Sequence, residues 1–238
     1  EAGVSLFAEL EVPESHYSWS FGRDTMVQMN YLRDRGFRAI KVKGFHNYGE
    51  TTRFLDATTK IDRELRFRVD FNGCLEPAAF RKFVEFMPLR VYRQMDLIED
   101  AVPYDAAVWS EVRQRWNVRL ALDKGWQHGT EGFDVVVVKP ARRDWRMVRE
   151  RHPTKRLMLT SAMDHPLGQA WAAYEAAHAK QELGDDLELC GLVTQHLFQR
   201  DAFSECLGVS GGVLQVDRAG TGLGFDHVLE KLDWQRLA

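Results

Sequence analysis

Apolar and charged side chains alternate over residues 39–44, a short segment near the start of the chain. Side chains of a strand point alternately to the two faces of a sheet, so Lys41 and Lys43 share one face while Ile40 and Val42 share the other. A short strand is the element that this alternation predicts. Taken alone, the two lysines also fit an exposed edge strand, because lysine discourages pairing with a second sheet.

Strand-like segments of this kind recur along the chain at regular intervals. Residues 65–72 alternate cleanly, and residues 135–138 are consecutive valines, which is typical of a parallel strand buried on both faces. The predicted strands cover residues 16–21, 39–44, 65–72, a segment ending at 98–99, and residues 118–123, 134–140, 156–162 and 189–193.

Between the strands, apolar residues recur at the spacing of an amphipathic helix. The predicted helices cover residues 23–35, 51–63, 76–87, about 108–116 and 166–183, with a short one at 225–232. The glycine-rich stretch 208–224 is predicted to be a loop, and residues 1–10 resemble the tail of a helix.

Strands that alternate with helices imply βαβ units and a parallel sheet. Successive predicted strand ends, at residues 43, 70, 99, 123, 139 and 161, are 16 to 29 residues apart, which is close to one βα unit each. The spacing favours a closed α/β barrel of the TIM type over an open doubly wound sheet. In such a barrel the active site lies at the carboxyl ends of the strands.

Bulk composition narrows the class of protein. The chain has 238 residues, and 32 basic against 35 acidic side chains give a net charge of −3, which indicates neither a nucleic-acid nor an anionic membrane partner. No apolar run approaches the ~20 residues of a membrane helix. The widely spaced Cys74, Cys190 and Cys206 are typical of reduced thiols, so a cytoplasmic location is predicted.

Carboxylates end three successive predicted strands, at Asp70, Glu99 and Asp123. In a barrel these ends lie side by side, so we expect the three side chains to converge. Oxygen ligands without His or Cys suit a hard cation such as Mg²⁺. The alternative for each carboxylate is a helix N-cap or a solvated loop position.

Lysines are expected on both sides of these acids, Lys41 and Lys43 on the second strand and Lys139 on the sixth. A lysine beside other cations loses proton affinity and can act as a general base at neutral pH. Together with a metal that binds a carboxylate, the lysines point to abstraction of the proton next to a substrate carboxylate.

The strand-end motifs resemble the signatures of the enolase superfamily, and of its muconate-lactonising subgroup in particular. The motifs, in order, are Lys41-Val42-Lys43, Arg68-Val69-Asp70-Phe71-Asn72, Ile98-Glu99, Ala121-Leu122-Asp123 and Val138-Lys139-Pro140. Residues 160–168 further resemble the seventh-strand segment of the o-succinylbenzoate synthase family, with Ser161 ahead of Asp164 and a Leu-Gly pair.

The resemblance implies a role for each motif residue. Asp70, Glu99 and Asp123 would hold Mg²⁺ or Mn²⁺. Lys43 would remove the α-proton and later protonate the departing hydroxyl, while Lys139 would stabilise the enediolate from the opposite side. The residues implied in substrate binding are Lys41, Arg68, Asn72, Ser161 and Asp164.

The activity implied is the syn dehydration of 2-succinyl-6-hydroxy-2,4-cyclohexadiene-1-carboxylate to o-succinylbenzoate, a step of menaquinone biosynthesis. The expected partner is this small carboxylate substrate, with the protein a monomer or a homo-oligomer. An N-succinylamino-acid racemase or dipeptide epimerase would use the same two lysines. A barrel that binds metal without catalysis is the third alternative.

The resemblance also implies a domain organisation, and the sequence departs from the family pattern at two positions. The fold would be a modified (β/α)7β barrel at residues 16–205, with the usual N-terminal α+β capping domain largely missing from this sequence. Residues 1–15 would be a remnant of a capping helix, and residues 206–238 would pack on the barrel or cap. Asp100 follows Glu99 and could compete with it as a metal ligand, and Lys124 follows the third acid.

Overall fold

The computed structural model describes residues 3–126 and 131–235. Its elements are β1 (Ser15–Ser18), α1 (Thr25–Asp34), β2 (Ala39–Lys43), α2 (Tyr48–Ile61), β3 (Arg66–Asp70), α3 (Pro77–Glu85), α4 (Leu89–Gln94), β4 (Met95–Glu99), α5 (Ala106–Trp116), β5 (Leu120–Leu122), β6 (Val135–Val138), α6 (Trp145–Arg151), β7 (Arg156–Leu159), α7 (Pro166–Leu183), β8 (Cys190–Val193), β9 (Gly208–Ser210), β10 (Val213–Gln215) and α8 (Asp226–Leu229).

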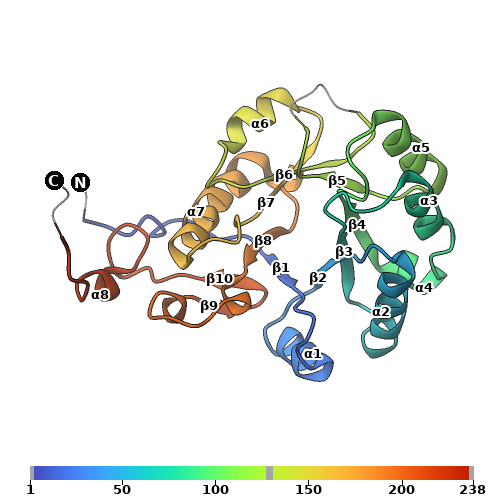
Figure 1. The fold of residues 1–238 in the computed structure, drawn as a ribbon. Helices are drawn as coiled ribbons and strands as arrows, with labels where there is room; N and C mark the ends of the chain where they lie inside the picture. Colours follow the sequence, from blue (N-terminus) through green and yellow to red (C-terminus); the bar gives the residue numbers. More distant parts are fainter. Residues whose placement is uncertain (1–2, 127–130, 236–238) are drawn as a thin grey trace.

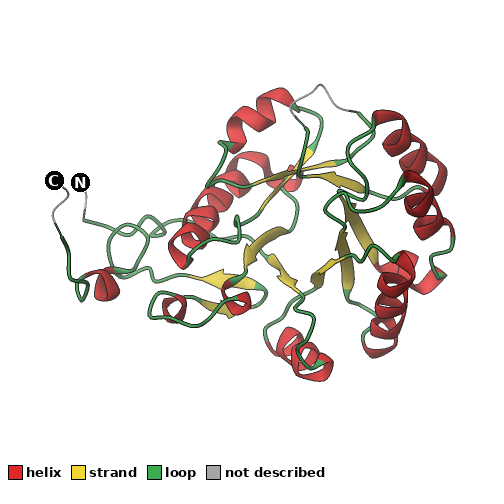
Figure 2. Ribbon diagram, viewed as in Figure 1, coloured by secondary structure: helices red, strands yellow, loops and turns green. Residues whose placement is uncertain are grey.

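The first eight strands form a closed ring with helices outside it (Figures 1 and 2). Parallel pairing runs in the order β7-β6-β5-β4-β3-β2-β1-β8. Bridges from Leu157 to Leu187 and from Thr160 to Gly191 bring β7 against β8 and complete the circle. The predicted parallel α/β barrel is confirmed.

Strand alternation divides the core into two parts. Outward side chains such as Ile40, Val42 and Val69 are fully buried against the helices. Inward side chains form a smaller cluster in the barrel interior, made of Leu97, Ala121, Val135, Val137 and Met158. All valines of β6 are buried, as expected for a strand covered on both faces.

The structure rules out the edge-strand and helix-cap alternatives for the strand-end charges. Strand β2 pairs with β1 on one side and β3 on the other, so Lys41 and Lys43 do not lie on an edge strand. The side chains that cap helix N-termini in the described part of the chain are Asp24, Asn47, Asp105, Asp144 and His165. Asp70, Glu99 and Asp123 are not among them.

Helix α7 spans the residues predicted for it, because proline at its first turn and glycine just beyond its end fix both limits. Other expectations were wrong. Residues 6–9 form turns where a helix tail was predicted, and the stretch 208–224 contains the β9–β10 hairpin in addition to loop. Helix α4 was not predicted, and α8 is shorter than expected.

The C-terminal segment packs against the barrel. Val209, Leu214 and Phe225 belong to the same buried cluster as the outward strand residues. The backbone of Ser15 donates to Gly212 at 2.8 Å, which ties the hairpin to the start of β1. The division of the chain at residues 15 and 205 remains a prediction. No helix in residues 3–126 and 131–235 has both the length and the apolar character required to cross a membrane.

Candidate active site

A cavity of about 880 Å³ opens at the carboxyl ends of the barrel strands. Lys43, Asp70 and Glu99 are the last residues of β2, β3 and β4. All three side chains line this cavity, because alternate residues of a strand share one face and each of these strands ends at an inward position. The predicted site residues that line the cavity are Lys41, Lys43, Asp70, Asn72, Glu99, Asp123, Lys139 and Ser161.

Each of the three predicted metal-binding carboxylates contacts a lysine. Lys41 Nζ donates to Glu99 Oε1 and Oε2 at 2.8 and 2.7 Å and lies 3.0 Å from Asp70 Oδ2. Lys43 Nζ donates to Asp70 Oδ2 at 2.6 Å, and Lys139 forms an ion pair with Asp123. In this arrangement the described residues contain no cluster of three acidic, His or Cys side chains around one point.

Burial and the neighbouring opposite charges shift the pKa values of these groups in opposite directions. Burial disfavours a charged Lys41, yet the carboxylates of Glu99 and Asp70 hold the pKa of Lys41 above its ordinary value. Burial also opposes ionisation of Asp70, but Lys41 and Lys43 hold the pKa of Asp70 well below its usual range. At Glu99 burial prevails over the attraction of Lys41, and its pKa is raised.

Asp100 adds a fourth carboxylate beside the site. Burial, together with the negative charge of Glu99, raises its pKa to about 7. Its Oδ1 accepts a hydrogen bond from the backbone of Asp123 at 3.1 Å, and it does not line the cavity. The carboxylates thus carry more negative charge than their lysine partners relieve. This donor set of oxygens only, with the pKa values of Glu99 and Asp100 raised, fits a hard divalent cation.

Lys43 and Lys139 face each other across the cavity. They end or follow β2 and β6, which lie four positions apart in the eight-stranded ring and are therefore diametrically opposite. Asp70, Glu99 and Asp123 come from β3, β4 and the end of β5, on the arc between the two lysines. A substrate bound beside these acids would thus have an amine on either side.

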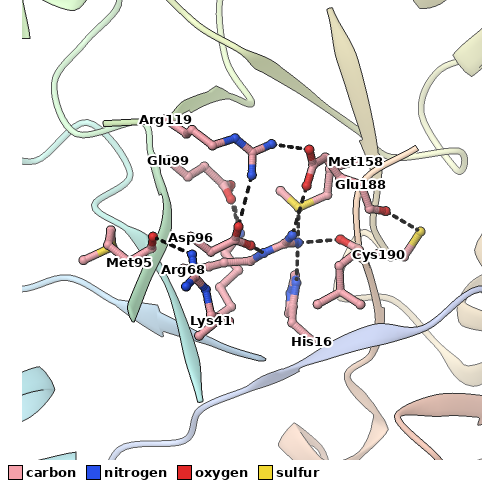
Figure 3. A network of polar contacts seen from close by, with 12 residues as sticks. His16, Lys41, Arg68, Met95, Asp96, Glu99, Arg119, Met158, Glu188 and Cys190 are labelled. Atoms are coloured by element: carbon pink, nitrogen blue, oxygen red, sulfur yellow. Dashed lines mark hydrogen bonds and ion pairs between the residues drawn. The ribbon is translucent and has the colours of Figure 1, made fainter. Parts of the chain in front are cut away.

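Two predicted substrate-binding residues do not line the cavity. Arg68 lies deeper in the barrel, is 1% exposed, and donates from Nε to Asp96 Oδ2 at 2.6 Å (Figure 3). Asp164 lies in the loop before α7, where its carboxylate packs against Gly168. Neither side chain can therefore contact a substrate in this cavity directly.

The remaining predicted residues are held by local hydrogen bonds. Ser161 Oγ and Thr194 Oγ1 lie 2.9 Å apart and form a hydroxyl pair between the ends of β7 and β8. Asn72 has a left-handed backbone with φ of 53°, and its N–H donates to Asp70 Oδ1 at 2.9 Å. This bond fixes the orientation of the Asp70 carboxylate.

Sequence reasoning missed several cavity residues, above all His16, which is 2% exposed. His16 and Ser18 share the inward face of β1, so the alternation of that strand was the signal that could have found them. The other missed lining residues are Trp19, Ser20, Phe21, Lys124, Gly125, Trp126, Val137, Arg142, Arg143, Thr160, Ala162, Met163, Gly191, Thr194 and Leu197.

Comparison with known proteins supports the enolase-superfamily resemblance. No family model matches the chain. An o-succinylbenzoate synthase of Bdellovibrio bacteriovorus is 33% identical over 215 residues, which cover 87% of this chain and 63% of that protein. The chain thus spans less than two thirds of the length of this relative.

Solved structures share the fold at lower identity. A mandelate racemase/muconate lactonizing protein from Herpetosiphon aurantiacus matches with a TM-score of 0.74 at 18% identity, over 93% of this chain and 68% of that one. The L-Ala-D/L-Glu epimerase from Bacillus subtilis matches with a TM-score of 0.72 at 18% identity, over 93% and 66%. Muconate cycloisomerase from Pseudomonas fluorescens matches with a TM-score of 0.70 at 16% identity, over 92% and 65%.

The same superfamily is indicated by the barrel, by the order of charged residues at its strand ends and by these relatives. The chain is thus similar to the enolase superfamily in sequence, and it shares the barrel fold of the superfamily's mandelate racemase/muconate lactonizing members.

Proposed function

We propose that the protein is an o-succinylbenzoate synthase, which dehydrates 2-succinyl-6-hydroxy-2,4-cyclohexadiene-1-carboxylate to o-succinylbenzoate in menaquinone biosynthesis. The observation that carries the proposal is the pair of lysines, Lys43 and Lys139, on opposite sides of one cavity with the acids between them. The 33% identical synthase from Bdellovibrio bacteriovorus supports this substrate.

Asp70, Glu99 and Asp123 would hold a divalent cation, Mg²⁺ or Mn²⁺. When bound, the cation supplies positive charge beside the substrate carboxylate, which lowers the pKa of the neighbouring C–H. Lys43, at 2.6 Å from Asp70, is the amine placed to remove that proton. The C–H electron pair then becomes part of the ring π-system as the C–O bond breaks, and Lys43 returns the proton to the departing hydroxyl, which leaves as water.

Lys139 acts as a cation in this reaction. It lies across the cavity from Lys43, so its ammonium group can stabilise negative charge on the substrate carboxylate from the opposite face. The aromatic product is strongly favoured over the diene. The site therefore requires a base, a positive environment and a shaped cavity, and the three reduced cysteines fit a cytoplasmic enzyme.

A racemase or epimerase is the second candidate, and the opposed lysines are the observation that favours it. One amine on each face of a carbon acid permits removal of a proton from one side and delivery from the other. The same cavity and acids would serve an N-succinylamino acid or a dipeptide, and the difference would lie in the return of the proton.

The experiment follows the appearance of o-succinylbenzoate by absorbance in the presence of Mg²⁺. We expect the wild-type protein to turn over, and Lys43→Ala and Lys139→Ala each to lose activity by at least about 100-fold. Lys60→Ala is the control, because Lys60 is exposed on α2 and pairs only with Asp56 among the described residues. Exchange of the α-proton of N-succinylamino acids without dehydration would favour the racemase instead.

A further inference from the structure

His16 lies on the inward face of β1 and lines the cavity beside Thr160 and Gly191, from the loop end of β7 and from β8. We call these three residues the cavity floor. The lysines and acids come from β2 to β6, whereas the floor comes from β7, β8 and β1. The floor thus lies on the side of the cavity opposite the acids.

Arg68 determines which ring nitrogen of His16 carries the proton. Arg68 Nη1 lies 3.3 Å from His16 Nδ1 (Figure 3). A guanidinium group can only donate, so Nδ1 must accept and the proton of a neutral ring resides on Nε2. Arg68 is itself held by Asp96, at 2.6 Å from its Nε, and by Glu188, at 3.4 Å from its Nη2.

The surroundings also keep His16 neutral. Burial, followed by the positive charges of Arg68 and Lys41, lowers the pKa of His16 well below its ordinary value, and the opposing effect of Asp70 is smaller. An uncharged Nε2–H group therefore persists at neutral pH. It is a hydrogen-bond donor that adds no further cation to a site already containing lysines.

Within residues 3–126 and 131–235, the floor leaves two polar groups without protein partners. Among the described residues His16 makes its hydrogen bond through Nδ1 alone, so Nε2 has none. Thr160 is 5% exposed and its Oγ1 has no hydrogen-bond partner in the described part of the chain. Gly191 makes room for the ring, because a Cβ there would lie 2.9 Å from His16 Nε2 and 2.8 Å from the Thr160 methyl group.

We propose that His16 is a substrate-binding residue whose Nε2–H donates to an acceptor oxygen on the succinyl side chain of the substrate. Arg68 acts through it as a positioning residue that fixes the tautomer. The inference rests on the proposed function, in which the reacting carboxylate lies with the acids and lysines. The succinyl group then extends to the opposite wall, where its oxygens can accept from His16 and from the Thr160 hydroxyl.

The test is the affinity of the Mg²⁺-loaded protein for o-succinylbenzoate and for benzoate, which lacks the succinyl group, measured by titration calorimetry. Loss of one buried hydrogen bond predicts that His16→Leu binds o-succinylbenzoate about 10- to 100-fold more weakly and binds benzoate as the wild type does. His16→Gln can place an amide N–H near the position of Nε2 and should recover most of the loss. His178→Leu, on the outer helix α7, is the matched control and should bind as the wild type does.

Nitrogen NMR of the imidazole ring gives a readout independent of the ligand. We expect the Nε2–H tautomer of His16 at pH 7, and a mixture of tautomers in Arg68→Met. A charged ring, or a proton on Nδ1 in the wild type, would overturn the inference. Equal affinity of His16→Leu and wild type for o-succinylbenzoate would overturn it while leaving a measured dehydration intact, whereas a wild type that neither binds nor forms o-succinylbenzoate would overturn the proposed function as well.

Discussion

Lys41 Nζ lies 2.7 Å from Glu99 Oε2 and 3.0 Å from Asp70 Oδ2, so one ammonium group joins the ends of three neighbouring strands. Both carboxylates are almost fully buried, and without a cation between them each would repel the other. Lys41 therefore stabilises the site's acids in a protein without metal, at the place where a divalent cation would also relieve them.

Replacement of Lys41 by methionine should destabilise the protein in EDTA by roughly 3–5 kcal/mol, because among the described residues it leaves the buried Glu99 carboxylate without a cationic partner and Asp70 with Lys43 alone. Urea unfolding measures the change. Mg²⁺ should recover part of the loss, since a cation bound to the same acids stabilises the folded state alone. Lys60→Met, which removes an exposed ion pair at 3.6 Å, should change stability by less than about 0.5 kcal/mol. Equal effects of the two substitutions would contradict this account.

Asp100→Asn should stabilise the metal-free protein above pH 7. Folding raises the pKa of Asp100 to about 7, so its contribution to stability is fully present below its unfolded pKa near 4 and is lost as the pH rises towards and through 7. Asparagine is neutral at every pH, accepts the same hydrogen bond from Asp123 and tolerates the left-handed backbone at φ of 42°.

Unfolding of Asp100→Asn and wild type should be compared at pH 5 and pH 8 in EDTA. We expect a gain of roughly 2–4 kcal/mol for the variant at pH 8 and a much smaller difference at pH 5. A pH-independent difference would mean that the carboxylate is not the cause. Mg²⁺ affinity of the variant tells whether Asp100 also contributes to the cation site.

Strand alternation was sufficient to predict which face of the barrel each charge occupies, but not how deep it lies. Arg68 and Asp70 share the inward face of β3, as predicted, yet they lie two residues apart, which is about 6.6 Å along a strand. Asp70 reaches the cavity and Arg68 does not. Depth depends on strand tilt and stagger around the closed ring, which no local pattern contains.

Two other misses also have identifiable causes. His16 lies on a four-residue strand, and the other floor residues, Thr160 and Gly191, come from the distant end of β7 and from β8, so the cavity floor is created only when the barrel closes. The β9–β10 hairpin was predicted as loop because glycines dominate the stretch. Gly211 and Gly212, both with positive φ, form its turn, and this glycine pair was the hairpin signal available in the sequence.

Glu188→Gln should destabilise the barrel because Glu188 is 6% exposed and is shared by three arginines. It contacts Arg119 and lies 3.4 Å from Arg68 Nη2 (Figure 3). It also lies 2.6 Å from Arg156 Nε. Loss of its charge leaves buried Arg68 with Asp96 alone as acidic partner among the described residues. We expect a loss of about 3–5 kcal/mol in urea unfolding.

Glu182→Gln provides the matched control for Glu188→Gln. Glu182 pairs with Arg146 at 2.6 Å, but both side chains are largely exposed, so its removal should cost at most about 1 kcal/mol and the effect should fade in high salt. If Glu188→Gln showed the same small, salt-sensitive effect, the interior network would not be a source of barrel stability.

Gly191→Ala should weaken binding of o-succinylbenzoate through His16, because the added methyl group would lie 2.8 Å from the ring Cε1 and push the imidazole away from β8. Overpacking of this kind typically costs about 1–3 kcal/mol of stability. To separate a general loss of packing from displacement of His16, Gly191→Ala is combined with His16→Ala, which removes the obstructing ring. If the alanine acts through the ring, the second substitution should have little further effect on affinity, and the coupling between the two sites should be about 0.5–3 kcal/mol. Additive losses of affinity would mean that Gly191 shapes the cavity independently of His16. The effect of Gly191→Ala would then not support a contact between the His16 ring and the succinyl group.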